Sequence, residues 1–343
     1  MKFLSYMTIG ATLFAASLST TAPAQAETLR WGDHFPQCCN MFTKASEWMA
    51  EEMSDRTDGE LEANIQFGGV LASVREAPTA IETGLMDMGN VVVPYFPEQM
   101  PINNALPFFT PNTLNQRDVG ELWLKWHEEI PAFSEELARY NMKLLTVRPL
   151  PNYGFICTSP IRTLEDFKGK RIRTYGIALP ALVEALGGVP VSFVDVEMYE
   201  AMSNNILDCS ASDLGFVEAF QLHEVASYFV NVPLGANWGQ IIAMNLDTYN
   251  ALSDDEKAMF EEMKGDHLEH LLALFEEEET RIKTRWAEEG LVEIIDFPAD
   301  EFLAATLENE GVQAARDSWV QRVTAAGMPL DDAERVISDI TGE

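Results

Sequence analysis

The chain has 343 residues, a length that suits one large or two medium domains with sizeable hydrophobic cores. It carries 23 Lys and Arg against 55 Asp and Glu, which gives a formal net charge of −32. Such an acidic surface repels nucleic acid and anionic membranes, so neither is expected as a partner, and an anion site would need positive charge close by.

The first 26 residues have the pattern of a secretory signal peptide. Lys2 precedes an apolar run over 3–16, and Ala24-Gln25-Ala26 is a small-residue cleavage site. A membrane anchor is the alternative, but the apolar run is shorter than the roughly 20 residues that span a bilayer. We therefore expect cleavage before Glu27 and an exported, periplasmic protein.

Short strands alternate with amphipathic helices through the first half of the mature chain. This alternation predicts an α/β fold with a parallel sheet covered on both faces. The expected strands are 29–31, 61–67, 88–93 and 143–148, and the expected helices are 40–56, 73–83 and 116–140.

The same alternation continues to residue 245, after which the chain is mostly helical. Expected strands are 153–157, 171–173, 189–194 and 206–209, with helices over 178–186 and 195–202. The sequence Ser253-Asp254-Asp255-Glu256 is a capping box that opens a long helix to Glu289, and a second helix is expected over 301–325. His267 and His270 are expected on a solvated face of the long helix rather than in a metal site.

Arg173 stands at the carboxyl end of an expected strand, and Ser212 and Asp213 follow another. Ligands of α/β sheets bind beyond these strand ends. The planar guanidinium fork of an arginine matches a carboxylate with two parallel hydrogen bonds. The residues alone leave open whether Arg173 contacts a ligand or is a surface or salt-bridged arginine.

The four cysteines are Cys38, Cys39, Cys157 and Cys209. An even number in an exported chain permits disulfides, although adjacent cysteines pair only through a strained ring. Cys157 and Cys209 could be neighbours or separate buried thiols, and we favour buried thiols. No spacing suggests zinc.

Motifs of enzymes are missing from the sequence. It has no GxSxG, P-loop, HExxH or GxGxxG after a strand, and no nucleophile with an orienting base. We therefore expect a binding protein rather than an enzyme, with no cofactor and no metal.

Several segments resemble the extracytoplasmic solute-binding proteins of TRAP transporters, the tripartite ATP-independent periplasmic family. The strongest similarity lies in LEDFKGKRIR over 164–173, ALGGVPV over 185–191, EMYEA over 197–201 and ILD over 206–208. Further matching segments are GVL over 69–71 and IETGLMD over 81–87. The order of these segments is that of the family across nearly the whole mature chain.

The resemblance implies a two-lobed periplasmic binding protein fold that closes over a ligand, with a long helix spanning both lobes. It implies a first lobe of 27–152 plus about 242–282 and a second lobe of 153–241 plus about 283–343. Arg173 matches the family's carboxylate-clamping arginine. The implied partners are a small organic acid and the small and large membrane subunits of the transporter, and we expect a monomer.

The chain also departs from the family pattern. Many members have a second arginine near the position of Phe155 and Ile156, and many have an asparagine at the position of Ser212. Members that bind keto acids have a Glu-Trp pair that would begin at the position of Cys209. Neither the sialic-acid pattern nor the cation-bridged keto-acid pattern therefore carries over.

Side chains at strand ends and in loops are the remaining candidates for ligand contact. The aromatic ones would form walls for an aromatic or apolar acid, and the polar ones could hold a hydroxyl or a positive group. A zwitterionic osmolyte held by a cation–π site is an alternative ligand. A subunit of an ATP-driven importer and a sensory ligand-presenter are alternative roles. The candidates are His34, Phe35, Tyr95, Phe96, Tyr153, Ser212, Asp213 and Trp238, besides Arg173.

Overall fold

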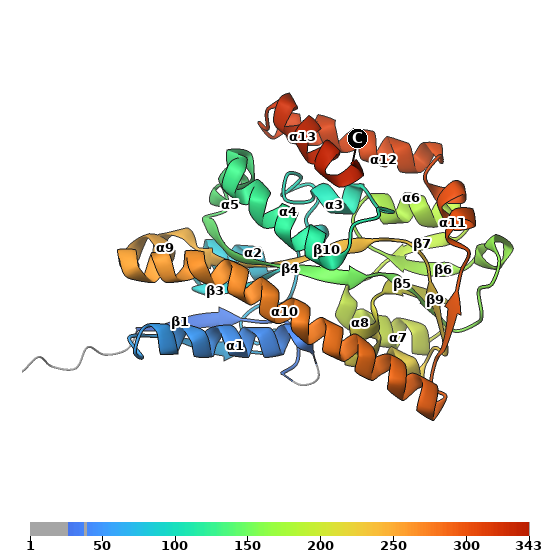
Figure 1. The fold of residues 1–343 in the computed structure, drawn as a ribbon, viewed down its shortest axis with the longest axis horizontal. Helices are drawn as coiled ribbons and strands as arrows, with labels where there is room; N and C mark the ends of the chain where they lie inside the picture. The colour runs from blue at the N-terminus through green and yellow to red at the C-terminus, as the bar shows by residue number, and fades with distance from the viewer. Residues whose placement is uncertain (1–26, 38–39, 343) are drawn as a thin grey trace, which may run out of the picture.

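The computed structural model describes residues 27–37 and 40–342, except for the side chains of Asn237 and Trp238. The predicted signal peptide and Cys38 and Cys39 lie outside the described residues. Two sheets surrounded by helices form two lobes (Figure 1), which confirms the predicted α/β class and the two-lobed arrangement. We call the part around the first sheet the first lobe and the part around the second sheet the second lobe.

The first sheet has five strands in the order β2-β1-β3-β10-β4. Strand β1 runs parallel to β2 and β3, whereas β10 runs antiparallel to β3 and β4. The expectation of a purely parallel sheet is therefore wrong. The strands are β1 (Glu27–Gly32), β2 (Leu61–Gln66), β3 (Met88–Val91), β4 (Met142–Asn152) and β10 (Ala236–Asn245).

The second sheet has six strands in the order β11-β9-β5-β8-β6-β7. Strand β5 is antiparallel to both β8 and β9 because it follows β4 after a single residue, Tyr153, and so enters from the other lobe. The strands are β5 (Gly154–Cys157), β6 (Arg171–Thr174), β7 (Val189–Ser192), β8 (Cys209–Ser212), β9 (Tyr228–Asn231) and β11 (Glu293–Asp296). Ser212 thus lies inside β8, not after a strand ending at Cys209.

Strands β4 and β10 and helix α10 (Asp254–Glu289) are the main connections between the lobes. The paired strands β4 and β10 pass between them, and helix α10 lies across both (Figure 1). The capping box predicted at Ser253 is present, and the 36 residues of α10 extend about 54 Å. Met263 packs in the core of the first lobe and Trp286 in that of the second, so the helix belongs to both.

The remaining helices follow the predicted order with two breaks. The helix expected over 116–140 is divided at Pro131, because proline disfavours a helical conformation in the preceding Ile130. The helix expected over 301–325 is divided before Asn309, which caps α12. The α-helices are α1 (Met41–Arg56), α2 (Ala77–Glu82), α3 (Ala105–Phe108), α4 (Gln116–Glu129), α5 (Pro131–Ala138), α6 (Ala178–Ala185), α7 (Met198–Ser203), α8 (Leu214–Ala219), α9 (Leu246–Ala251), α11 (Ala299–Thr306), α12 (Glu310–Ala325) and α13 (Leu330–Thr341), and the short 3₁₀ helices are η1 (Val93–Tyr95), η2 (Leu164–Phe167), η3 (Asp195–Glu197) and η4 (Leu222–Glu224).

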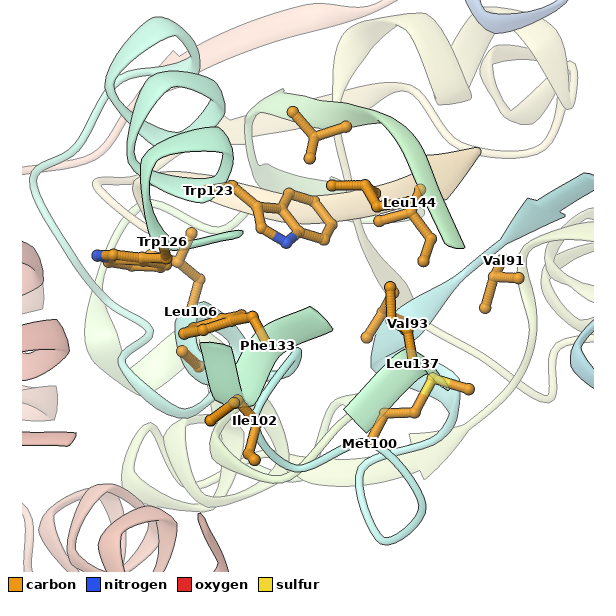
Figure 2. Packing of buried hydrophobic residues seen from close by; sticks show 14 of the residues in the cluster. Val91, Val93, Met100, Ile102, Leu106, Trp123, Trp126, Phe133, Leu137 and Leu144 are labelled. Carbon is orange, nitrogen blue, oxygen red and sulfur yellow. The ribbon is translucent and has the colours of Figure 1, made fainter. Parts of the chain in front are cut away.

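The largest core cluster lies between the first sheet and helices α4 and α5. Figure 2 shows Trp123, Trp126 and Phe133 in one cluster with residues such as Val91 of β3 and Val93 of η1. The C-terminal helices α12 and α13 add further apolar side chains to this first-lobe cluster, among them Trp319. The predicted residue boundaries of the lobes remain a prediction, and this packing ties residues beyond 315 to the first lobe.

His267 is buried, so the expectation of a solvated face is wrong for this residue. It lies on the side of α10 that packs against α1 and β4, and the ring of His270 stacks on Trp48 at 4.5 Å. Burial keeps the pKa of His267 well below its usual value. Over the described ranges, no group of three His, Cys, Asp or Glu side chains could hold a metal ion.

Within the described part of the chain, no helix combines the length and apolarity needed to cross a membrane.

We predict that Gly239→Ala disrupts the pairing of the two crossing strands. A Cβ at residue 239 would lie 2.1 Å from the carbonyl oxygen of Arg148 in β4, so the backbones would have to separate. We expect a loss of about 1–3 kcal/mol in the free energy of unfolding, measured by urea denaturation.

Gly265→Ala is the matched control, because residue 265 lies within α10 and an added Cβ would meet nothing within 4 Å. This variant should gain about 0.5–1 kcal/mol in unfolding free energy. Equal effects of the two substitutions would contradict the close contact between β4 and β10.

Candidate functional site

Arg173 lies in β6 and is almost fully buried between the lobes, with 1 % of its surface exposed. Its Nε donates to the carbonyl oxygen of Phe193 at 3.0 Å, and its Nη1 donates to the carbonyl oxygen of Ala211 at 3.1 Å. Its Nη2 donates to the hydroxyl of Tyr95 at 3.0 Å. A guanidinium has five N–H groups, and the described residues accept hydrogen bonds from three of those of Arg173.

Three tyrosines surround this guanidinium. It lies 4.8 Å from the ring centre of Tyr175, whose ring meets those of Tyr153 and Tyr95 edge to face. Burial lowers the pKa of Arg173, but the neighbouring tyrosines and Asp195 outweigh burial and raise it. The site therefore keeps a full positive charge in surroundings where water does not screen it.

Residues from the two lobes meet directly at Arg173. The Tyr95 hydroxyl accepts a second hydrogen bond, from the backbone N–H of Asp195, at 3.0 Å. The Asp195 carboxylate lies 3.3 Å from Nε2 of His34 at the end of β1. Burial raises the pKa of Asp195, whereas His34 and Arg173 lower it by more than this. The pKa therefore lies below its usual value, and the carboxylate stays ionised. His34 and Tyr95 from the first lobe thus close onto Asp195 and Arg173 from the second.

A small cavity of about 20 Å³ lies between these residues, which is roughly the room that one water molecule needs. Its wall combines the guanidinium, three tyrosines and apolar side chains, with two residues from the crossing strand β10. The lining residues are Val92, Pro94, Tyr95, Leu150, Tyr153, Arg173, Tyr175, Asp195, Phe216, Gly239 and Gln240.

The structure brings three of the nine predicted site residues, Tyr95, Tyr153 and Arg173, to this cavity, and His34 reaches it through Asp195. The others lie elsewhere. Phe35 packs in the aromatic cluster of Phe42 and Phe216, and Phe96 is half-buried against the first-lobe core. The side chain of Trp238 lies outside the described residues.

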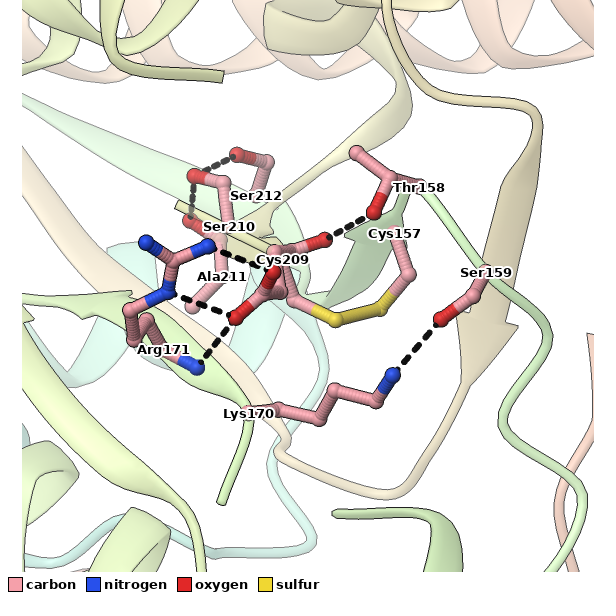
Figure 3. Close-up of a disulfide and its surroundings, with 10 residues drawn as sticks. Cys157, Thr158, Ser159, Lys170, Arg171, Cys209, Ser210, Ala211 and Ser212 are labelled. Carbon is pink, nitrogen blue, oxygen red and sulfur yellow. Dashed lines mark hydrogen bonds and ion pairs between the residues drawn. A yellow bond between two sulfur atoms is a disulfide. The ribbon is translucent and has the colours of Figure 1, made fainter. Parts of the chain in front are cut away.

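The hydroxyl of Ser212 lies 3.1 Å from that of Ser210 (Figure 3), and Ser212 is fully buried. Asp213 caps α8 by accepting a hydrogen bond from the N–H of Phe216 at 3.0 Å. It lines a second, smaller cavity together with Phe42 and Glu278. Its Oδ2 has no hydrogen-bond partner among the described residues, and burial raises its pKa to about 7.

Sequence reasoning missed Tyr175, Asp195, Phe216 and Gln240 as site residues. The sequence predicts only that Asp195 begins a helix, whereas its carboxylate also meets His34 from the other lobe. Gln240 is the one residue with a polar side chain in the run from 239 to 244. A single polar residue within an apolar strand could have been recognised as a candidate.

A larger hollow of about 580 Å³ lies beside α10, away from Arg173. Glu278, Glu279 and Asp296 line it, and its one lysine, Lys283, forms an ion pair with Glu279. The described lining offers no unpaired positive charge, so an anion is better held at the smaller cavity.

A disulfide joins Cys157 in β5 to Cys209 in β8 (Figure 3). The two residues are directly opposite in the antiparallel pair, and their Cα atoms are 4.1 Å apart. The interpretation of both as buried thiols is therefore wrong. It failed because β8 begins at Cys209 instead of ending there. The bridge fixes β8 beside β5, and the next strand after β8 in the sheet is β6 with Arg173.

A second buried arginine, Arg148, is structural. Its Nη2 donates to the Ser46 hydroxyl at 2.6 Å and to the carbonyl oxygen of Phe42 at 3.0 Å, both in α1. Burial lowers its pKa to about 10, while the Asp33 carboxylate 4.0 Å away acts in the opposite direction. Arg148 thus ties β4 to α1 and does not line the cavity.

Residues 34–315 match the family model of bacterial extracellular solute-binding proteins, family 7, called DctP. A relative of known name is the ectoine-binding periplasmic protein TeaA of Halomonas elongata, which is 24 % identical over 328 residues and covers 92 % of this chain and 88 % of TeaA.

Solved structures share the fold at low sequence identity. DctP6, an extracytoplasmic solute receptor of Bordetella pertussis that binds pyroglutamic acid, has a TM-score of 0.76 at 19 % identity, covering 90 % of this chain and 99 % of the receptor. A TRAP periplasmic solute-binding protein of Bordetella bronchiseptica with bound mandelate also has a TM-score of 0.76, at 20 % identity, covering 91 % and 97 %.

We predict that Asp213 makes the unliganded protein less stable as the pH rises from about 4 to 7. Its pKa of about 7 in the folded state lies above the ordinary value of 3.8. Over this range the unfolded chain releases the proton and the folded chain keeps it. The free energy of unfolding therefore falls as the pH rises, by up to about 4 kcal/mol at pH 7.

Asp213→Asn keeps the capping oxygen and cannot ionise, so it should flatten this part of the stability profile, as measured by urea denaturation at several pH values. Asp300→Asn, at an exposed position in the first turn of α11, is the control and should leave the profile unchanged. Identical profiles for wild type and Asp213→Asn would contradict the raised pKa.

Proposed function

Because the chain belongs to family 7 of the bacterial extracellular solute-binding proteins, whose members are transporter components, we propose that it captures a small organic acid outside the cytoplasm. The buried, charged Arg173 in a cavity between two lobes supports this proposal more than any other observation. In such water-poor surroundings an arginine–carboxylate pair is much stronger than on a surface.

The proposed capture begins with the carboxylate at Arg173. Its Nη1 and Nη2 each have a second N–H, for which the described residues supply no acceptor. Two N–H groups on neighbouring nitrogens suit the two oxygens of one carboxylate. The protein contacts of Nε and Nη1 are carbonyl oxygens of the second lobe, so they hold the guanidinium in place while a ligand binds.

Closure of the lobes follows from the position of Tyr95 and His34. Both come from the first lobe and bond to Arg173 or Asp195 of the second. An acid on Arg173 would therefore be enclosed when the lobes rotate about β4 and β10, as in other two-lobed binding proteins. A cavity of about 20 Å³ has room for about one water molecule, so the lobes would lie farther apart around a bound acid, and a compact acid needs the smallest such movement.

The proposed partner is the membrane permease of a TRAP transporter, with its small and large subunits, to which the closed protein delivers the acid. An exported, periplasmic protein that acts as a monomer fits this role, since both lobes of the site come from one chain. A subunit of an ATP-driven importer and a sensory ligand-presenter are the alternatives, and the genes beside this one would distinguish them.

A zwitterionic osmolyte is a second candidate ligand. The ionised Asp195 carboxylate lines the same cavity as Arg173, so the two residues could hold opposite charges of one molecule. The tyrosine rings could face a cationic group. The ectoine-binding relative TeaA supports this candidate.

We predict that Arg173→Lys weakens the binding of a small organic acid at least tenfold, because lysine keeps the charge but loses the fork. A thermal-shift screen over aliphatic, aromatic, hydroxy and sugar acids and betaines would first identify a ligand. At 100 times its dissociation constant, that ligand should add about 2.7 kcal/mol to the stability of the wild type.

Arg171→Ala is the matched control. Arg171 lies two residues earlier in β6, and its fork holds Asp208 at 2.8 and 2.9 Å. Neither residue lines the cavity. Its loss should leave ligand stabilisation unchanged. Equal ligand affinity in Arg173→Lys and wild type would remove Arg173 from the site.

A further inference from the structure

Gln240 lines the cavity of Arg173 and has a buried amide oxygen without a hydrogen-bond partner among the described residues. It comes from the crossing strand β10, next to Gly239, and only 1 % of its surface is exposed. Gln240 and Arg173 line the same cavity. Among the described residues, none donates a hydrogen bond to its Oε1.

An acceptor in this position is costly unless something donates to it. A buried polar atom without a partner costs about 1–3 kcal/mol, and nearly all such atoms in native proteins are satisfied. The unpaired Oε1 of Gln240 and the free N–H groups of Arg173 therefore belong to residues that line one small space.

Arg173 and Gln240 would recognise different chemical groups of a ligand. Arg173 only donates hydrogen bonds and carries a positive charge, so it selects a carboxylate. The amide oxygen of Gln240 only accepts, so it selects an O–H or N–H group. Apolar side chains such as Leu150 and Phe216 form part of the wall. The wall also holds tyrosine hydroxyls and the Asp195 carboxylate, but both oxygens of that carboxylate already have partners, in His34 and the N–H of Val196.

We infer that the ligand is a compact acid with an O–H or N–H donor close to its carboxylate, such as a hydroxy acid or an N-acyl amino acid, and that Gln240 accepts the hydrogen bond from this donor. The inference rests on the proposed function, since it presumes a carboxylate at Arg173. A plain alkanoic or keto acid would leave the amide oxygen unpaired and bind more weakly.

Gln240 is thus a specificity-determining residue that lies in the strand connecting the lobes and not in the sheet that carries Arg173. Its strand pairs with β4 at the passage between the lobes, where the register of the pair shifts between Asn237 and Gln240. The carboxylate is thus held by the second lobe, and the donor is recognised by the connection between the lobes.

The test uses pairs of acids that differ only in the donor. One pair is 2-hydroxybutyrate and butyrate. The other is N-acetylglycine and 4-oxopentanoate, in which a CH₂ replaces the N–H. Titration calorimetry on the full mature protein should show that the donor-bearing acid of at least one pair binds at least about tenfold more tightly, the effect of 1.4 kcal/mol.

Gln240→Met removes the acceptor at similar side-chain length. The variant should bind both acids of a pair with about equal affinity. Its affinity for the donor-free acid should stay within about threefold of that of the wild type. Gln313→Met, at an exposed position in α12, is the control and should keep the full preference.

Equal wild-type affinities within both pairs, or a preference that persists in Gln240→Met, would overturn the inference and leave the role of Arg173 intact. A failure of every acid to bind the wild type would overturn the proposed function itself. If Gln240→Met does not fold, the wild-type comparison of the two pairs decides alone.

Discussion

The architecture of this protein depends on keeping the charge of Arg173 away from water. Two carbonyl oxygens of the second lobe hold the guanidinium, and the Tyr95 hydroxyl meets it from the first lobe. An ionised group is stable in such a place only when its N–H groups are well paired. The strands, the tyrosines and the approach of the two lobes together pair three of its five N–H groups, so the contacts of Arg173 also organise the interface between the lobes.

The crossing strands make recognition and lobe movement parts of one structure. Gly239 allows β10 to approach β4 closely, and the next residue, Gln240, faces the cavity. A ligand contact with Gln240 would therefore be made on one of the two strands about which the lobes would move. Helix α10 has Met263 in one core and Trp286 in the other, so any such movement would have to keep or bend this helix.

Local signals in the sequence predicted much of the fold but only part of the candidate site. The capping box at Ser253, the strand before Arg173 and the alternation of strands and helices depend on neighbouring residues, and the structure contains them. The positions of Asp195, Gln240 and His267 depend on contacts between segments far apart in the chain, which periodicity does not reveal. The departure of β5 and β10 from a parallel arrangement has the same origin, since it follows from the passage of the chain between lobes.

The bridge between Cys157 and Cys209 bears on how the protein is made. It encloses β6, α6, β7 and α7, and therefore Arg173, in a loop closed by residues 52 positions apart. Thiols stay reduced in the bacterial cytoplasm and oxidise after export. In an extracellular solute-binding protein the second lobe therefore acquires its covalent link after export, and material produced in a reducing compartment would contain Arg173 in a loop that nothing has yet closed.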